Sequence, residues 1–169
     1  LKTKIIKIKY SIESNKYNFK NKKKKLITYM SRKLPKHSTL VISFLKKHLP
    51  NKWIIKDLNN INEKEVYRNL CQSKIFLAFS NLEGLPLPPV EAAIAGNYVI
   101  GYTGEGGKDY WEKPIFTEIY SGDIRNFVKQ VIKKILEINL NKNLKQKQYK
   151  KLVKEFSKDN EIHHIKKFL

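Results

Sequence analysis

The chain has 169 residues, of which 41% are hydrophobic, and a formal net charge of +20. This length suits one domain with a proper core, and the nine Tyr, eight Phe and two Trp residues exclude an intrinsically disordered chain. The single cysteine excludes an internal disulfide and favours a reducing compartment, and no apolar run approaches the ~20 residues that span a bilayer.

The first half of the chain predicts strands and helices in alternation. Residues 1–25 are rich in lysine and weakly patterned, so we expect a basic N-terminal segment or interdomain linker there. Pro35 opens a stretch whose apolar residues recur with helical spacing. Asn62, with Glu65 three residues later, has the pattern of a helix N-cap. The elements expected here are strands at 26–30 and 53–55, a helix at 35–49, and a helix that starts after residue 62.

The second half continues the alternation. The apolar run at 75–79 is typical of a strand buried on both faces, and a proline-rich turn follows it. A short helix of small residues then ends at Gly96. Residues 139–169 are expected to form a basic C-terminal helical segment, which leaves 26–138 as the main domain. The other elements expected are a helix at 90–95, strands at 98–102 and 115–120, and helices at 123–138 and 144–156.

This order of elements predicts an α/β fold, an open Rossmann-like parallel sheet with helices on both faces. Ligands of such sheets bind at the carboxyl ends of the strands. Three loops with unusual chemistry follow strands, at 31–34, 80–89 and 103–109. We therefore expect these loops to meet at one edge and to form the binding site.

The richest segment of the sequence follows the buried strand. Glu83 is followed by Gly84, which lets a ligand approach the backbone closely, and Pro88 and Pro89 pre-set the start of a helix. A helix N-terminus attracts anions, and Glu91 lies close enough to accept hydrogen bonds from a ribose diol. Phosphate on amides and diol on carboxylate together describe a nucleotide-diphosphate sugar. The alternative is a solvated turn residue at Glu83 and a carboxylate at Glu91 that caps its own helix.

This segment resembles the signature of GT-B glycosyltransferases of the large retaining family four. That signature has two Glu residues separated by seven others, after a hydrophobic strand and before a helix of small residues. Glu83 and Glu91 have this spacing, and Gly96 followed by a strand fits the continuation. The layout matches over about 26–138, and the motif itself is sharp over 75–107.

The resemblance implies a role for each site residue. Glu91 would bind the ribose hydroxyls of the donor nucleotide, and Glu83, the catalytic candidate, would contact hydroxyls of the transferred sugar. Arg32 and Lys33 would neutralise the diphosphate, with Lys36 as a third candidate, although the family's two basic residues are usually several positions apart. A solvated basic turn is the alternative for this pair. The backbone stretch that would hold the sugar and diphosphate comprises Gly84, Leu85, Pro86 and Leu87.

The reaction implied is metal-independent transfer of a sugar, with no cofactor, from a UDP- or GDP-linked donor to an acceptor hydroxyl in glycan, lipid or polysaccharide synthesis. The resemblance places the chain as the C-terminal donor-binding domain, with the acceptor held by a missing N-terminal domain of the same enzyme. It implies a cytoplasmic enzyme, with peripheral contact to the inner face of the cell membrane as an option.

The glycine-rich loop after the strand at 98–102 is not a dinucleotide fingerprint, because its spacing is wrong. Gly106 and Gly107 are expected to lie on the ligand edge and to line the cleft, with a plain flexible turn as the alternative. Tyr110 and Trp111 are better explained as core anchors than as a sugar-stacking platform. The histidines show no metal-ligand spacing, so no metal site is expected.

The positive charge is concentrated at the two ends of the sequence. The excess is +12 over residues 1–36, zero over 37–128 and +8 over 129–169. Lysine-rich surfaces imposed by an AT-rich genome, attraction to an anionic membrane and nucleic-acid binding all remain open, although nucleic acid is not the partner expected. The rival functions are a basic binding module for nucleic acid or membranes, a related nucleotide-sugar epimerase, and a sugar phosphorylase, whose pyridoxal lysine motif is not evident.

Overall fold

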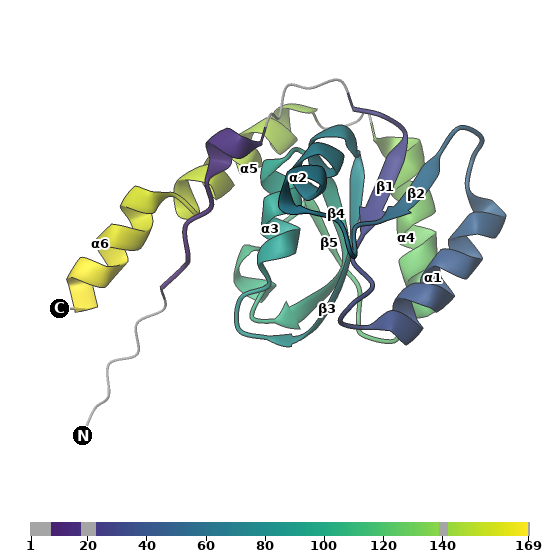
Figure 1. The fold of residues 1–169 in the computed structure, drawn as a ribbon, viewed down its shortest axis with the longest axis horizontal. Helices are drawn as coiled ribbons and strands as arrows, with labels where there is room; N and C mark the ends of the chain where they lie inside the picture. The colour runs from purple at the N-terminus through teal and green to yellow at the C-terminus, as the bar shows by residue number, and fades with distance from the viewer. Residues whose placement is uncertain (1–7, 18–22, 139–141, 169) are drawn as a thin grey trace.

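The computed structural model describes residues 8–17, 23–138 and 142–168. Its centre is a five-stranded sheet in the order β2-β1-β3-β4-β5, and every neighbouring pair is parallel (Figure 1). This confirms the predicted α/β class. The strands are β1 (Leu26–Tyr29), β2 (Ile54–Asp57), β3 (Ile75–Glu83), β4 (Tyr98–Glu105) and β5 (Phe116–Glu118). The α-helices are α1 (Pro35–His48), α2 (Glu63–Gln72), α3 (Leu87–Ile94), α4 (Ile124–Glu137), α5 (Lys142–Glu155) and α6 (Lys158–Phe168).

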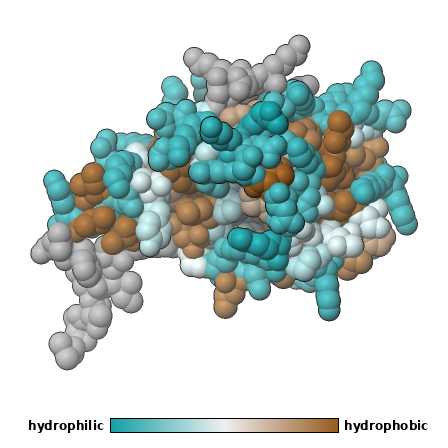
Figure 2. Space-filling model, in the orientation of Figure 1, coloured by the Kyte–Doolittle hydropathy of each residue, from teal (hydrophilic) through white to brown (hydrophobic). Residues whose placement is uncertain are grey.

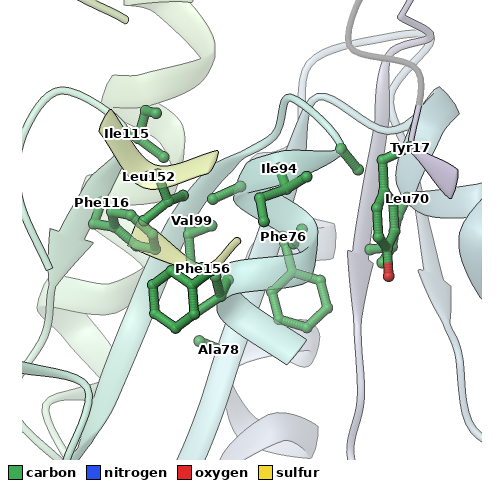
Figure 3. Close-up of a cluster of buried hydrophobic side chains, with 14 of the residues drawn as sticks. Tyr17, Leu70, Phe76, Ala78, Ile94, Val99, Ile115, Phe116, Leu152 and Phe156 are labelled. Atoms are coloured by element: carbon green, nitrogen blue, oxygen red, sulfur yellow. The ribbon is translucent and has the colours of Figure 1, made fainter. Parts of the chain in front are cut away.

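Helices cover both faces of the sheet, as right-handed crossovers between parallel strands require (Figure 1). The helices α1 and α4 pack on one face around a core that includes Ile27, Leu45 and Phe127. The helices α2, α3 and α5 cover the other face. Figure 3 shows this second core, in which Phe156 at the end of α5 lies beside Phe116 of β5.

The central strands run further than the apolar pattern predicts. We expected strands at 75–79 and 98–102, whereas β3 continues to Glu83 and β4 to Glu105. The ladder between them continues past a register shift at Ser80/Glu83, because backbone hydrogen bonds do not require apolar side chains. Glu83 is therefore the last residue of β3 and not part of the following loop. The helix α3 also begins at Leu87, three residues before the expected start.

The C-terminal helices and the N-terminal segment pack against each other. The backbone N–H of Ile12 donates to the carbonyl of Phe156 over 2.9 Å, and the Ser11 hydroxyl donates to Glu161 over 2.7 Å. The apolar side of α5 joins the core, since Leu152 and Phe156 are buried. The helix α6 was not expected as a separate element.

Hydrophilic residues cover most of the face in view, with apolar residues visible at both ends of the molecule (Figure 2). Some lysines instead reach buried carbonyl groups. Lys145 donates to the carbonyl of Gly96 over 2.8 Å, after the end of α3, and burial lowers the pKa of Lys145 to about 7. No helix within the described ranges is long and apolar enough to cross a membrane.

Candidate functional site

The carboxyl ends of β1, β3 and β4 share one edge of the sheet, as predicted for the loops at 31–34, 80–89 and 103–109. A cavity of about 310 Å³ opens there. Its apolar floor comes from β3, and its walls come from the loop after β1, the loop after β2 and the first turn of α3. The lining residues are Met30, Arg32, Lys33, Leu58, Asn59, Asn60, Ile61, Phe76, Leu77, Ala78, Phe79, Ser80, Glu83, Pro88 and Pro89.

Three of the predicted site residues meet at this cavity. Arg32 and Lys33 lie on the loop after β1, and Glu83 ends β3. The Lys33 ammonium forms an ion pair with the Glu83 carboxylate, and 40% and 16% of the two side chains are exposed. The sequence predicts both residues in one site, but their direct pairing is a result of the fold.

A polar network fixes the two loops that form one side of the cavity. The Ser31 hydroxyl donates to the Asp57 carboxylate over 2.6 Å, and the Asn59 side-chain amide donates to the Ser31 hydroxyl over 2.6 Å. The residue pattern of the sequence does not predict the loop that carries Asn59 and Asn60 as part of the site. It follows β2, so the rule that ligands bind at the carboxyl ends of strands was the signal that would have found it.

Glu91 is not among the residues that line the cavity. It lies on α3, half-buried, where the Tyr17 hydroxyl donates a hydrogen bond to its carboxylate. Tyr17 is 6% exposed and packs edge-to-face on Tyr67, with ring centroids 5.1 Å apart. Burial raises the pKa of Glu91, and the hydrogen bond from Tyr17 opposes that rise. No local signal pointed to Tyr17, because it lies far from Glu91 in the sequence.

The entry to α3 offers a limited set of backbone donors. Gly84 is exposed, and a Cβ added there would meet nothing within 4 Å, so this backbone is open to a ligand. The helix has no side-chain cap at its N-terminus. Because Pro86, Pro88 and Pro89 carry no N–H, the donors left in the predicted stretch are the amides of Gly84, Leu85 and Leu87.

Gly106 packs against the strand end that carries Glu83, and neither Gly106 nor Gly107 is among the residues that line the cavity. The Gly106 N–H donates to the carbonyl of Glu83 over 3.0 Å, and a side chain at Gly106 would collide with the backbone of Gly84. Gly107 is buried against the backbone of Thr103. The buried Tyr110 hydroxyl donates to the carbonyl of Pro86 over 2.8 Å. This loop therefore holds the backbone of Glu83 and Pro86 in place beside the cavity.

No group of three or more His, Cys, Asp or Glu side chains is placed to hold a metal ion in the part of the chain that the structure describes. Arg32 and Lys33 are the basic residues among the described residues that line the cavity. Cys71 is buried in the core.

The fold is GT-B glycosyltransferase-like, as the resemblance of the 83–91 segment predicted. The crystal structure of the pneumococcal O-GlcNAc transferase GtfA in complex with UDP and GlcNAc matches with a TM-score of 0.61 and 16% identity, covering 95% of this chain and 38% of that one. The structure of the GtfA/B complex also matches with a TM-score of 0.61 and 16% identity, covering 88% of this chain and 36% of that one. The chain thus spans little more than a third of the length of these proteins. No family model and no curated protein matches it.

Proposed function

We propose that this chain is the nucleotide-sugar donor-binding domain of a glycosyltransferase. The observation that carries the proposal is the cavity at the carboxyl edge, where Glu83 meets the basic pair Arg32 and Lys33 in a GT-B-like fold. That GtfA was crystallised with UDP and GlcNAc supports a nucleotide-sugar as the ligand. The acceptor would be held largely by another domain of the enzyme.

The chemistry of the cavity suits the parts of such a donor. Leu58 and Ile61 offer apolar surface to a planar base, and Asn59 beside them offers amide hydrogen bonds. The diphosphate would be held by Arg32 and Lys33. On donor binding, the Lys33 ammonium would exchange its ion pair with Glu83 for a contact with a phosphate oxygen. The donor would then leave Glu83 free to accept hydrogen bonds from sugar hydroxyls.

In the proposed reaction the bond between the sugar and the diphosphate breaks, the acceptor oxygen bonds to the sugar, and the acceptor proton is released. Negative charge develops on the leaving diphosphate. Fixed cations beside it lower the barrier, because they need no reorganisation as the charge forms. Arg32 and Lys33 supply this stabilisation, together with the backbone amides at the entry to α3.

The proposal is tested by calorimetric titration of the chain with UDP, GDP, ADP and dTDP. We expect one diphosphate to bind, and Arg32→Ala to weaken it by about 10- to 100-fold, the effect of losing hydrogen bonds to a charged group. Glu137 ends α4 and is not among the residues that line the cavity, so Glu137→Ala is the matched control and should bind as the parent does. The proposal fails if no diphosphate binds, or if Arg32→Ala binds with unchanged affinity.

Contact with an anionic membrane surface is a second proposal, favoured by one observation on α1. The exposed side of this helix carries Lys36, Leu40, Phe44 and Lys47 at successive turns, and Leu40 and Phe44 are 48% and 47% exposed. The Lys47 ammonium lies 5.7 Å from the centre of the Phe44 ring. No acidic residue occurs in the sequence from 14 to 56. A basic and apolar helix face of this kind suits the boundary of an anionic bilayer.

A further inference from the structure

A second cavity, of about 210 Å³, lies on the same edge of the sheet. It is formed by the ends of β3, β4 and β5 and by Lys108, and it shares Ser80 with the first cavity. None of its residues is used in the proposed donor site except Ser80. Because Asn81 and Leu82 lead directly to Glu83 on β3, the two cavities flank the same strand end.

The two most exposed large hydrophobic side chains of the described residues both line this second cavity. Leu82 is 82% exposed and Tyr120 is 79% exposed. Apolar side chains left in water beside a hollow mark a binding site more often than a chance arrangement. An exposed tyrosine ring offers a flat apolar face together with a polar rim.

Polar groups also line this cavity. The lining includes the hydroxyls of Thr103 and Ser121 and the carboxylates of Glu105 and Glu118. Tyr102 also lines this cavity, but its hydroxyl is buried beside the backbone of Gly122.

The charge of the cavity excludes a second anion. Lys108 is the one cation among the described residues that line it, and its ammonium is already paired with Glu105 at 2.8 Å. With Glu118 also present, the cavity would repel a phosphate or a carboxylate. Carboxylates and hydroxyls accept hydrogen bonds from the hydroxyls of a sugar, and Tyr120 can pack against the apolar face of a sugar ring.

We propose that this second cavity binds a saccharide unit of the acceptor, beside the donor sugar at Glu83. The inference rests on the proposed donor function and adds a subsite to it. A saccharide in this place would lie on the other side of β3 from the nucleotide. An acceptor hydroxyl would thereby reach the transferred sugar from the sheet edge, so this domain would help to select the acceptor.

The test is a titration of the isotopically labelled full chain with methyl glycosides of glucose, galactose and N-acetylglucosamine, followed by amide NMR shifts, with and without saturating UDP. We expect at least one glycoside to shift amides around 80–82, 102–105 and 118–121. Tyr120→Ala should weaken that glycoside by about 3- to 10-fold, the value of one ring contact, and Glu118→Gln should weaken it as well. Leu136→Ala, at a position 77% exposed on α4, is the matched control.

The outcomes separate the two proposals. If UDP binds and no glycoside does, or if Leu136→Ala weakens the glycoside as much as Tyr120→Ala, the saccharide subsite is wrong and the donor site stands. Self-association of the parent chain that is lost in Tyr120→Ala would assign this surface to a protein contact and would also overturn the inference. If none of UDP, GDP, ADP and dTDP binds, the donor proposal is wrong.

Discussion

The carboxylate of Glu91 lies half-buried beside Tyr17, where it gains one hydrogen bond and loses much of its hydration. Its pKa is raised chiefly by that burial, so the charged form is less stable here than in water. If Glu91 binds a ribose diol, as the family resemblance implies, it tolerates such a cost, because functional groups are often held in less stable environments. Removing the charge of Glu91 should therefore raise the free energy of unfolding and weaken binding of the nucleotide.

Glu91→Gln should separate the two effects. A raised folded-state pKa means that the folded chain binds more protons than the unfolded chain at pH values above about 4.5, so the free energy of unfolding falls as pH rises through that window. Glutamine keeps an acceptor for Tyr17 and has no charge. We expect this variant to be at least as stable as the parent at pH 7 and to bind UDP more weakly.

Chemical denaturation between pH 5 and pH 8 measures this difference, and the gain over the parent should shrink toward pH 5 as Glu91 takes up a proton. Glu137→Gln on α4 serves as the control substitution. A Glu91→Gln variant that is less stable than the parent at pH 7 would contradict the prediction.

At the scale of elements, the glycine loop after β4 determines how closely two strand ends approach. Gly106 lies directly against the backbone of Gly84, and Gly104 adopts a left-handed φ of 64° that favours glycine. The loop thereby sets the position of the Glu83 carbonyl through its hydrogen bond to Gly106. Glycine is needed here for backbone packing rather than for flexibility.

Two alanine substitutions test this role. Gly106→Ala should lower the free energy of unfolding by about 1–3 kcal/mol, because the added methyl group must push the two loops apart. Gly84→Ala has open space around the new methyl group and should change stability by less than about 1 kcal/mol. Thermal and urea unfolding of the two variants provide the comparison. Equal destabilisation by both would show that close packing at Gly106 is not the cause.

At the scale of the whole molecule, most of the positive charge lies outside the proposed site. The neutral central segment supplies Glu83 and Glu91, and Arg32 and Lys33 come from the basic segment 1–36. The basic face of α1 combines charge with the exposed Leu40 and Phe44. Electrostatic attraction to an anionic bilayer falls with salt, and burial of apolar side chains does not.

Sedimentation with lipid vesicles tests the membrane proposal. The chain should bind vesicles that contain phosphatidylserine more strongly than pure phosphatidylcholine vesicles, and added salt should weaken that binding. Phe44→Ser should reduce it by several-fold, since one buried aromatic side chain contributes roughly 1.5–3 kcal/mol at most. Ile54→Ser, at a 64% exposed position on β2, should not. Equal binding to neutral vesicles, or stronger retention on duplex DNA, would contradict the proposal.

The sequence by itself determined the class of fold and the edge that carries the site. Asn62 caps α2 as its spacing with Glu65 predicted, with a hydrogen bond of 2.9 Å from the Glu65 N–H to the Asn62 side chain. The apolar run at 75–79 forms the first part of β3. These features are local: side-chain periodicity and capping depend on neighbours in the sequence, and parallel strands place their carboxyl ends together whatever their side chains are.

Only the tertiary structure decided which distant groups meet. The Lys33–Glu83 ion pair joins two strand ends, and the Tyr17 hydroxyl reaches Glu91 from the N-terminal segment. The lengths of β3 and β4, the burial of α5 and the two separate cavities are likewise set by packing between elements. Such contacts join residues far apart in the sequence. Which residues meet depends on how the side chains of the helices and the sheet pack together and on the register of the strands. No local sequence pattern encodes this packing.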